Sequence, residues 1–273
     1  MKTIMLLLTI LLLRYNALAQ GKWYFNSSLQ TVGSKYDDGS SHNSFFLYNG
    51  ITYQSGPVYL NFNFPLVVTS SNTFTQIENT FIPNNHMGRD SRHWFNGFPH
   101  MSDSEGRTSD SPAFGIGDFY INASYELIKE KNILPSFSLD GYIKLPTASD
   151  KLGIGTGEYD YQIALGAKKY LSGFMFYAQL GYLFLGKIEG TEISNPLTFS
   201  AGAAYILDNK KHSFYIGYDS YSTIIQGTSS PKQLGFGYNH LINQGLLLNT
   251  ILSIGLNSST SDYIFSIGLN KEI

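Results

Sequence analysis

Twelve stretches of alternating apolar and polar residues follow residue 20, and they constrain the fold of this chain more than any other feature. The last stretch is typical: Phe265, Ile267 and Leu269 alternate with Ser266, Gly268 and Asn270. Successive side chains of a β-strand point to opposite sides, so a strand of this kind has an apolar face and a smaller or more polar one. The chain therefore reads as a series of strands with two different faces.

The connections between these stretches alternate in length. The short ones lie near residues 55–56, 129–134, 171–172, 208–211 and 243–244, and the long ones span 35–43, 69–113, 147–158, 187–194, 222–231 and 257–261. Tight turns at one rim and longer loops at the other are typical of transmembrane β-barrels. Residues 20–273 are thus predicted to form an all-β fold, a transmembrane antiparallel up-and-down β-barrel of about twelve strands.

A secreted β-sandwich is the rival architecture, because its strands also alternate. Its turns recur every 8–12 residues or so, whereas one strand with its connection here takes roughly 21 residues. The chain also has 19 Phe and 20 Tyr but only 14% charged residues. Aromatic residues at the membrane interfaces and an apolar outer wall account for this balance better than a water-exposed surface does.

Residues 1–19 have the pattern of a secretory signal peptide. Lys2 precedes an apolar run from Ile4 to Leu13, and Ala17-Leu18-Ala19 provides small residues at a cleavage site. We therefore expect an integral protein of the bacterial outer membrane with both termini in the periplasm and the 69–113 loop outside the cell. The chain has no cysteine, which excludes disulfides and thiolate metal sites, and its net charge of −2 argues against nucleic acid as a partner.

The polar faces of the strands are expected to face the lumen. On this assignment the predicted pore-lining residues are Asp118, Glu126, Asp140, Tyr142, Lys144, Asp160, Lys168, Tyr177, Gln179, Tyr215, Asp219, Gln233 and Asn239. Charges of both signs with tyrosines and amides suit a narrow polar passage. The alternative is that these side chains pair with one another and fill the lumen, as they do in small barrels.

The 69–113 connection is longer than a passive link requires, and long loops are commonly functional or disordered. Arg89, Arg92, Trp94 and Arg107 are predicted to belong to a gating loop, which forms either an inward-folded constriction or a lid over the outer mouth. A solvated surface loop that touches lipopolysaccharide phosphates is the alternative. His86, His93 and His100 are spaced by seven residues, but no carboxylate ligands flank them at short spacing, so no metal site is predicted.

Catalytic signals in the chain are weak. His42 and Ser44 fall on one side of a strand near the outer rim, as an outer-membrane lipase would need, but no orienting acid lies nearby in sequence. The glycines between Gly153 and Gly157 lack the helix that follows a phosphate-binding loop. We expect no enzymatic activity and no cofactor.

From about residue 114 to 270 the chain resembles the outer-membrane channel family described as the MetA pathway of phenol degradation. The resemblance is carried by Gly115-Ile116-Gly117-Asp118, Lys144-Leu145-Pro146-Thr147, the glycines of 153–157 with Asp160, and Gly181-Tyr182. It implies a barrel that passes small, hydrophobic or aromatic compounds, and it brings no catalytic residues. Asp118 and Lys144 fall on inward faces of neighbouring strands, so we expect them to form a pair.

The function expected from these observations is that of an outer-membrane channel for small solutes, embedded in lipid and lipopolysaccharide and inserted by the barrel assembly machinery. A structural or adhesive barrel with a blocked lumen, acting through its outer loops, is the main alternative. An outer-membrane lipase is the third and least supported hypothesis.

Overall fold

The computed structural model describes residues 21–35, 41–70, 74–83, 112–149, 152, 154–186 and 193–273. Its elements are all strands: β1 (Lys22–Lys35), β2 (Ser41–Ser55), β3 (Val58–Ser70), β4 (Phe74–Ile77), β5 (Thr80–Pro83), β6 (Pro112–Ile116), β7 (Phe119–Ile128), β8 (Ser136–Leu145), β9 (Asp160–Leu171), β10 (Phe174–Phe184), β11 (Leu197–Ile206), β12 (His212–Tyr221), β13 (Lys232–Asn243), β14 (Leu246–Gly255) and β15 (Tyr263–Glu272). The described part of the chain has no helix long and apolar enough to span a bilayer.

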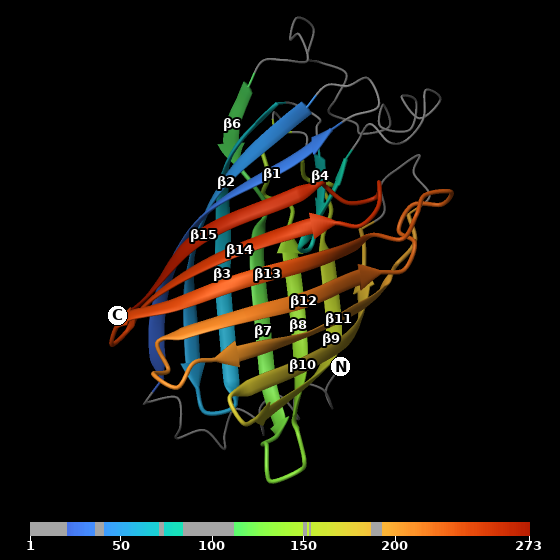
Figure 1. Ribbon diagram of the computed structural model, residues 1–273. Coiled ribbons are helices and arrows are strands. Elements are labelled where there is room, and N and C mark those ends of the chain that lie inside the picture. The colour runs from blue at the N-terminus through green and yellow to red at the C-terminus, as the bar shows by residue number, and fades with distance from the viewer. Residues whose placement is uncertain are drawn as a thin grey trace, which may run out of the picture.

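The strands form a closed antiparallel barrel (Figure 1). Each wall strand pairs with its neighbour in sequence, and β1 pairs with β15 over ten residues, which joins the two ends of the sheet. The seam is reinforced where the amide of Ile273 donates to the carbonyl of Trp23 at 2.9 Å and Lys22 pairs with Glu272 at 2.8 Å. This closure pairs the first strand with the last, as an antiparallel sheet in lipid requires.

The sheet has 13 strands, but two of them share one place in the wall. Residues 66–70 of β3 pair with β6, and residues 58–63 pair with β7. β6 and β7 are therefore one broken strand, and the wall has twelve strand positions. The break lies at Gly117 and Asp118, opposite Pro65, which has no amide hydrogen to give. Gly117 donates its amide to the carbonyl of Pro65 at 2.8 Å, and a Cβ at Gly117 would stand 2.6 Å from the proline ring. The prediction of about twelve strands is confirmed; the break was not predicted.

Short and long connections alternate as the sequence predicts. The short ones span 56–57, 129–135, 172–173, 207–211 and 244–245, and we call the rim that holds them the turn rim. The long ones span 36–40, 71–111, 146–159, 185–196, 222–231 and 256–262, and the strand ends that they join lie at the opposite rim, which we call the loop rim. Ser172 and Gly173 both have positive φ, the backbone of a type I′ hairpin turn. Pro146 follows the last residue of β8, as expected.

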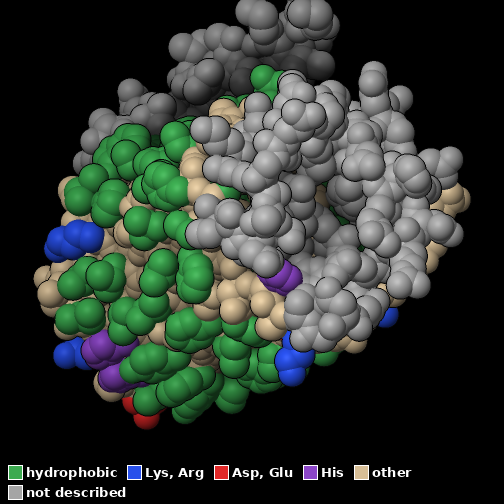
Figure 2. Space-filling model, turned by 90° about the horizontal axis from the view of Figure 1, so that it is seen from above, with side chains coloured by type: hydrophobic (Ala, Val, Ile, Leu, Met, Phe, Trp, Pro, Cys, Tyr) green, Lys and Arg blue, Asp and Glu red, His purple; other side chains and the backbone are tan. Residues whose placement is uncertain are grey.

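The outer wall is apolar. Leu165 at the middle of β9 is 61% exposed, and Leu29, Phe236 and Phe265 are also exposed on other strands. Hydrophobic side chains cover most of the wall that faces the viewer in Figure 2, with few charges among them. On β2, Phe45 and Leu47 lie outside while Phe46 and Tyr48 point inward, which settles the one strand whose sequence left both faces apolar. An exposed apolar wall of this extent fits contact with lipid.

The lumen contains a short hairpin made of β4 and β5, residues 74–83, which we call the plug hairpin. One of its faces places Phe74 and Phe81 against Phe46 and the neighbouring inner side of β1, β3 and β15. Its other face places Ile77 and Ile82 among apolar side chains of β7, β8, β10 and β12. Both faces are buried because the wall surrounds the hairpin. The sequence predicts a single loop over 69–113; the structure places part of that stretch inside the barrel as paired strands.

Candidate functional site

The thirteen predicted pore-lining residues all lie on the inward face of the wall, but they fall into three groups. Six of them border an open cavity toward the turn rim: Glu126, Asp140, Lys168, Tyr177, Gln179 and Asp219. Five are buried under the plug hairpin or near the loop rim: Asp118, Tyr142, Lys144, Asp160 and Gln233. The other two are Tyr215, which packs across the face of Gly237, and Asn239, which donates to Ser213 at 3.2 Å. Their role along a solute path stays a prediction.

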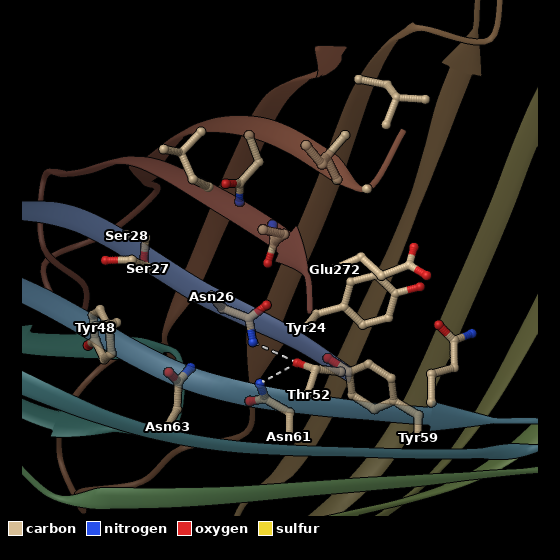
Figure 3. A pocket seen from close by; sticks show the side chains of 17 residues that line it. Tyr24, Asn26, Ser27, Ser28, Tyr48, Thr52, Tyr59, Asn61, Asn63 and Glu272 are labelled. Carbon is tan, nitrogen blue, oxygen red and sulfur yellow. Dashed lines mark hydrogen bonds between the residues drawn. The ribbon is translucent and has the colours of Figure 1, made fainter. Parts of the chain in front are cut away.

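The first cavity of the lumen has a volume of about 630 Å³, and amides, hydroxyls, tyrosines and leucines line it. Its one charged side chain is Glu272, which pairs with Lys22 at 2.8 Å. Strands β1, β2 and β3 contribute Tyr24, Asn26, Thr52, Tyr59 and Asn61 to it (Figure 3). The hydroxyl of Thr52 accepts from the amide of Asn26 at 2.7 Å and from the amide of Asn61 at 2.9 Å. These bonds fix the amides along the wall. Neutral amides, hydroxyls and tyrosine rings can contact a neutral or aromatic molecule without a charged partner.

Sequence reasoning missed most of this lining because it followed charged and aromatic residues of the later strands. Asn26, Asn61 and Asn63 were available as a signal, since each lies on the polar face of its strand. Their shared inward direction emerges only when the barrel closes and brings β1–β3 beside β13–β15.

A second cavity of about 570 Å³ adjoins the first, and the two share Gln54 and Tyr59 in their linings. Its lining holds three carboxylates, Glu126, Asp140 and Asp219, and one ammonium, Lys168. The carboxylate of Asp140 accepts from Ser124 at 2.5 Å, Ser138 at 3.0 Å and Gln179 at 2.9 Å. The hydroxyl of Ser200 donates to Asp219 at 2.5 Å. The excess of negative charge favours cations over anions in this part of the lumen.

A buried ionic cluster lies closer to the loop rim. The Nζ atom of Lys144 on β8 stands 2.6 Å from Oδ2 of Asp160 on β9 and 3.7 Å from Oδ2 of Asp118. The predicted pairing of Asp118 with Lys144 is therefore confirmed, and Asp160 joins it. Lys144 also donates to Thr156 at 2.5 Å, and Asp118 accepts from the amide of Ala148 at 2.8 Å. The cluster ties the strand break, β8 and β9 to the connection after β8.

The tip of the plug hairpin, at Glu78 and Asn79, enters the lumen at about the level of Tyr48. The carboxylate of Glu78 accepts from the hydroxyl of Tyr221 at 2.9 Å and from the amide of Gln162 at 3.2 Å. Beside it, Gln76 donates to the hydroxyl of Tyr48 at 3.1 Å. Burial raises the pKa of Glu78 to about 7, and the nearby negative charge of Asp219 adds to the effect, while the bonds from Tyr221 and Gln162 oppose it.

The backbone of the plug hairpin is also held at its sides. The amide of Gln76 donates to the carbonyl of Ile154 at 3.2 Å, and the amide of Ser261 donates to the carbonyl of Phe81 at 2.8 Å. These bonds come from two loop-rim connections on either side of the hairpin. The plug hairpin thus closes the loop-rim half of the lumen, while both cavities lie in the turn-rim half.

The predicted gate residues Arg89, Arg92, Trp94 and Arg107 lie outside the described residues, as do His86, His93 and His100. The gate therefore stays a prediction, although an adjacent part of the same connection does enter the barrel. Among the described residues, no three His, Asp or Glu side chains are grouped as a metal ion would need.

The lipase hypothesis receives no support at Ser44. This side chain is completely buried, and its hydroxyl is hydrogen-bonded to the hydroxyl of Thr69 on β3. A serine nucleophile must reach its substrate and needs a base with an orienting acid. A buried hydroxyl bonded to a threonine meets neither need.

Comparison with known protein families assigns the chain to one of them. Residues 95–271 match the model of the family described as "Putative MetA-pathway of phenol degradation". The chain belongs to this family. The match contains the strand break, Lys144 with its two carboxylate partners, and the whole of β7–β14. A search of curated proteins finds no match.

Solved structures share the fold. An outer membrane channel of the COG4313 group from Pseudomonas putida F1 superposes with a TM-score of 0.62 at 14% identity, covering 94% of this chain and 98% of the channel. The toluene transporter TodX of P. putida gives a TM-score of 0.44 at 11% identity, with 93% and 89% covered. The β-domain of the Bordetella autotransporter BrkA gives 0.50 at 8% identity, with 93% and 100% covered. At these identities the likeness concerns the architecture.

Proposed function

We propose that this protein is an outer-membrane channel for small neutral solutes, hydrophobic or aromatic in character, whose lumen is closed by the plug hairpin. The observation that carries the proposal is a closed barrel with an apolar outer wall and a cavity of about 630 Å³ in the turn-rim half of its lumen. A barrel built only as a scaffold has no need of such a cavity. A closed plug beside an open cavity suits a passage that opens on demand.

The solute class follows from the lining of the first cavity. Tyr24 and Tyr59 offer ring faces, and the amides of Asn26 and Asn61 offer polar groups without net charge. Aromatic side chains with a few fixed polar groups are the usual lining of sites for small organic molecules. The family description, which concerns phenol degradation, agrees with this class. We propose small aromatic compounds as solutes without choosing one of them.

We further propose that the turn rim and both termini face the periplasm, as short turns do in outer-membrane barrels. The loop rim then meets lipopolysaccharide, and Arg89, Arg92, Trp94 and Arg107 form a lid that continues the plug hairpin outward. We also propose that residues 1–19 act as the signal peptide for export and that the barrel assembly machinery inserts the processed chain.

The test is removal of the plug hairpin. Residues 74–83 are replaced by a Gly-Ser linker, and ion conductance in planar bilayers and uptake of phenol into loaded vesicles are compared with the parent. We expect the conductance to rise several-fold in the variant, because the loop-rim half of the lumen is then no longer filled. The shift of electrophoretic mobility on boiling serves as the control for a folded barrel.

The blocked barrel is the second candidate function, and the same hairpin favours it. Phe74, Phe81, Ile77 and Ile82 pack on both sides of the lumen, so the closed state is well filled. If the folded deletion variant conducts no better than the parent and admits no phenol, the channel is excluded. The protein would then act through its loop rim alone.

A further inference from the structure

Glu78 occupies an unusual position for a carboxylate. It lies at the tip of the plug hairpin with φ of 52°, a conformation that residues other than glycine seldom adopt. The side chain is half-buried, and its two bonds reach Gln162 on β9 and Tyr221 on β12, on the wall beneath the tip. This one side chain therefore connects the deepest point of the plug to two wall strands.

No ion pair between residues that the structure describes supplies a positive charge to Glu78. Among the described residues, the titratable or charged groups around the tip are Tyr221 and Asp219 on β12, Tyr142 and Lys144 on β8, Asp160 on β9, Tyr120 on β7, Tyr48 on β2 and Asp118 at the strand break. Lys144 is held by Asp160 and Asp118, and none of the described ion pairs includes Glu78. An ionised Glu78 thus faces the negative Asp219 without a compensating cation from the described wall.

We propose that Glu78 acts as a proton-operated latch: in its protonated form it holds the plug hairpin in the lumen, and in its ionised form it loosens that hold. This inference rests on the proposed function only for its effect on solute passage. The position of the hairpin itself can be measured in a barrel of any function.

The direction follows from proton linkage. The pKa of Glu78 is raised by burial from 4.5 to about 7 while the plug is seated, and a released hairpin would return it toward the ordinary value. The contribution of Glu78 to seating is therefore fully present below about pH 4.5 and is lost as the pH rises through about 7. The seating equilibrium should weaken by a factor on the order of 100 across this window. Acid favours the closed state.

A single cysteine gives a direct readout of seating, because the chain has no cysteine of its own. Thr80 on β5 is 1% exposed, and its hydroxyl has no hydrogen-bond partner, so Thr80→Cys is a mild change inside the plug. The rate of labelling with a maleimide is measured in detergent micelles between pH 5 and 8.5. The same series in Thr80→Cys with Glu78→Gln corrects for the pH dependence of the thiol reaction.

We expect the ratio of the two labelling rates to rise at least tenfold as the pH increases, with its midpoint near neutral pH. Adding Asp219→Asn should move that midpoint to lower pH, because a neighbouring negative charge is removed. Glu158→Gln, which alters an exposed carboxylate of the loop rim, should leave the midpoint where it was. The mobility shift on boiling shows that each variant is folded.

A ratio that stays flat within twofold across the range overturns the latch, as does a midpoint indifferent to Asp219→Asn. These results do not depend on whether the proposed channel function is correct. A pH-dependent ratio in a barrel that never conducts supports the latch and removes the channel. A flat ratio in a barrel that conducts once residues 74–83 are deleted supports the channel and removes the latch.

Discussion

At the scale of single residues, Lys144 has the most demanding environment in the barrel. Its side chain is completely buried, and two carboxylates surround it. A buried charge must be paired, and the loss of one member of such a cluster leaves the others uncompensated. Lys144 therefore stabilises the loop-rim half of the wall and has no contact with either cavity.

We expect Lys144→Met to destabilise the folded barrel by about 3–5 kcal/mol, because Asp118 and Asp160 would then face each other without a cation. The temperature at which the folded band disappears on electrophoresis measures the effect. Lys168→Met, in the lining of the second cavity, is the matched control and should shift that temperature much less. Equal shifts in the two variants would contradict the structural role of Lys144.

Residue-scale predictions from sequence succeeded where alternation and register act together. Asp118 and Lys144 fall on inward faces of adjacent strands, and their pairing follows from that alone. Glu78 was invisible to this reasoning, because its partners Gln162 and Tyr221 are 84 and 143 residues away in the chain. Asp118, Tyr142, Lys144 and Asp160 face inward as predicted, but they are buried and line neither cavity.

At the scale of elements, the plug hairpin belongs to a connection between two wall strands, yet its side chains form part of the hydrophobic core. Phe81 is 2% exposed, with its ring centroid 5.0 Å from that of Phe46 on β2 and 6.5 Å from that of Phe74. Aromatic packing of this kind adds to the burial of apolar area. Seating of the hairpin therefore depends on packing as well as on the contacts of Glu78.

Phe81→Ala should weaken seating at every pH, since truncation of a buried phenylalanine costs about 3–5 kcal/mol. In the Thr80→Cys background, labelling should become faster at acid and alkaline pH alike. The midpoint of the pH dependence should stay unchanged, because Glu78 keeps its surroundings in the seated state. A change confined to alkaline pH would argue that packing contributes little to seating.

The hairpin also shows why short elements escape sequence reasoning. β4 and β5 have four residues each, and both faces are buried and mix apolar with polar residues, so the alternation that reveals the wall strands is absent. Their turn uses Glu78 and Asn79 instead of a glycine pair, which removes the usual hairpin signal. The broken strand was hidden for a similar reason, since Gly117 reads as an ordinary strand glycine until Pro65 lies opposite it.

At the scale of the whole molecule, the wall was predictable because the residues of each strand alternate between an apolar face toward lipid and a more polar face toward the lumen. This alternation has a period of two residues, and it recurs in the strands at all twelve positions of the wall. The state of the lumen was not predictable, because barrel width leaves a filled and an open interior equally possible at this size. The structure contains both, one toward each rim.

The charge of the second cavity should set ion preference in any conducting state. Asp140→Asn together with Glu126→Gln leaves one carboxylate, Asp219, and one ammonium, Lys168, in a lining that now holds three carboxylates. We expect the cation preference, measured as the reversal potential in a salt gradient, to decline toward zero. The plug-deleted barrel is used in order to give a measurable current. A reversal potential unaltered by both substitutions would show that ions take another route.

The plug hairpin comes early in the chain, yet some of its contacts come last. Ile264 and the amide of Ser261, which touch Phe81 and its neighbours, belong to the segment that completes the cylinder against β1. During synthesis the hairpin therefore lacks part of the wall that it packs against until the final strand is available. Assembly of the wall and filling of its interior end together, so a chain that stops before β15 would lose both.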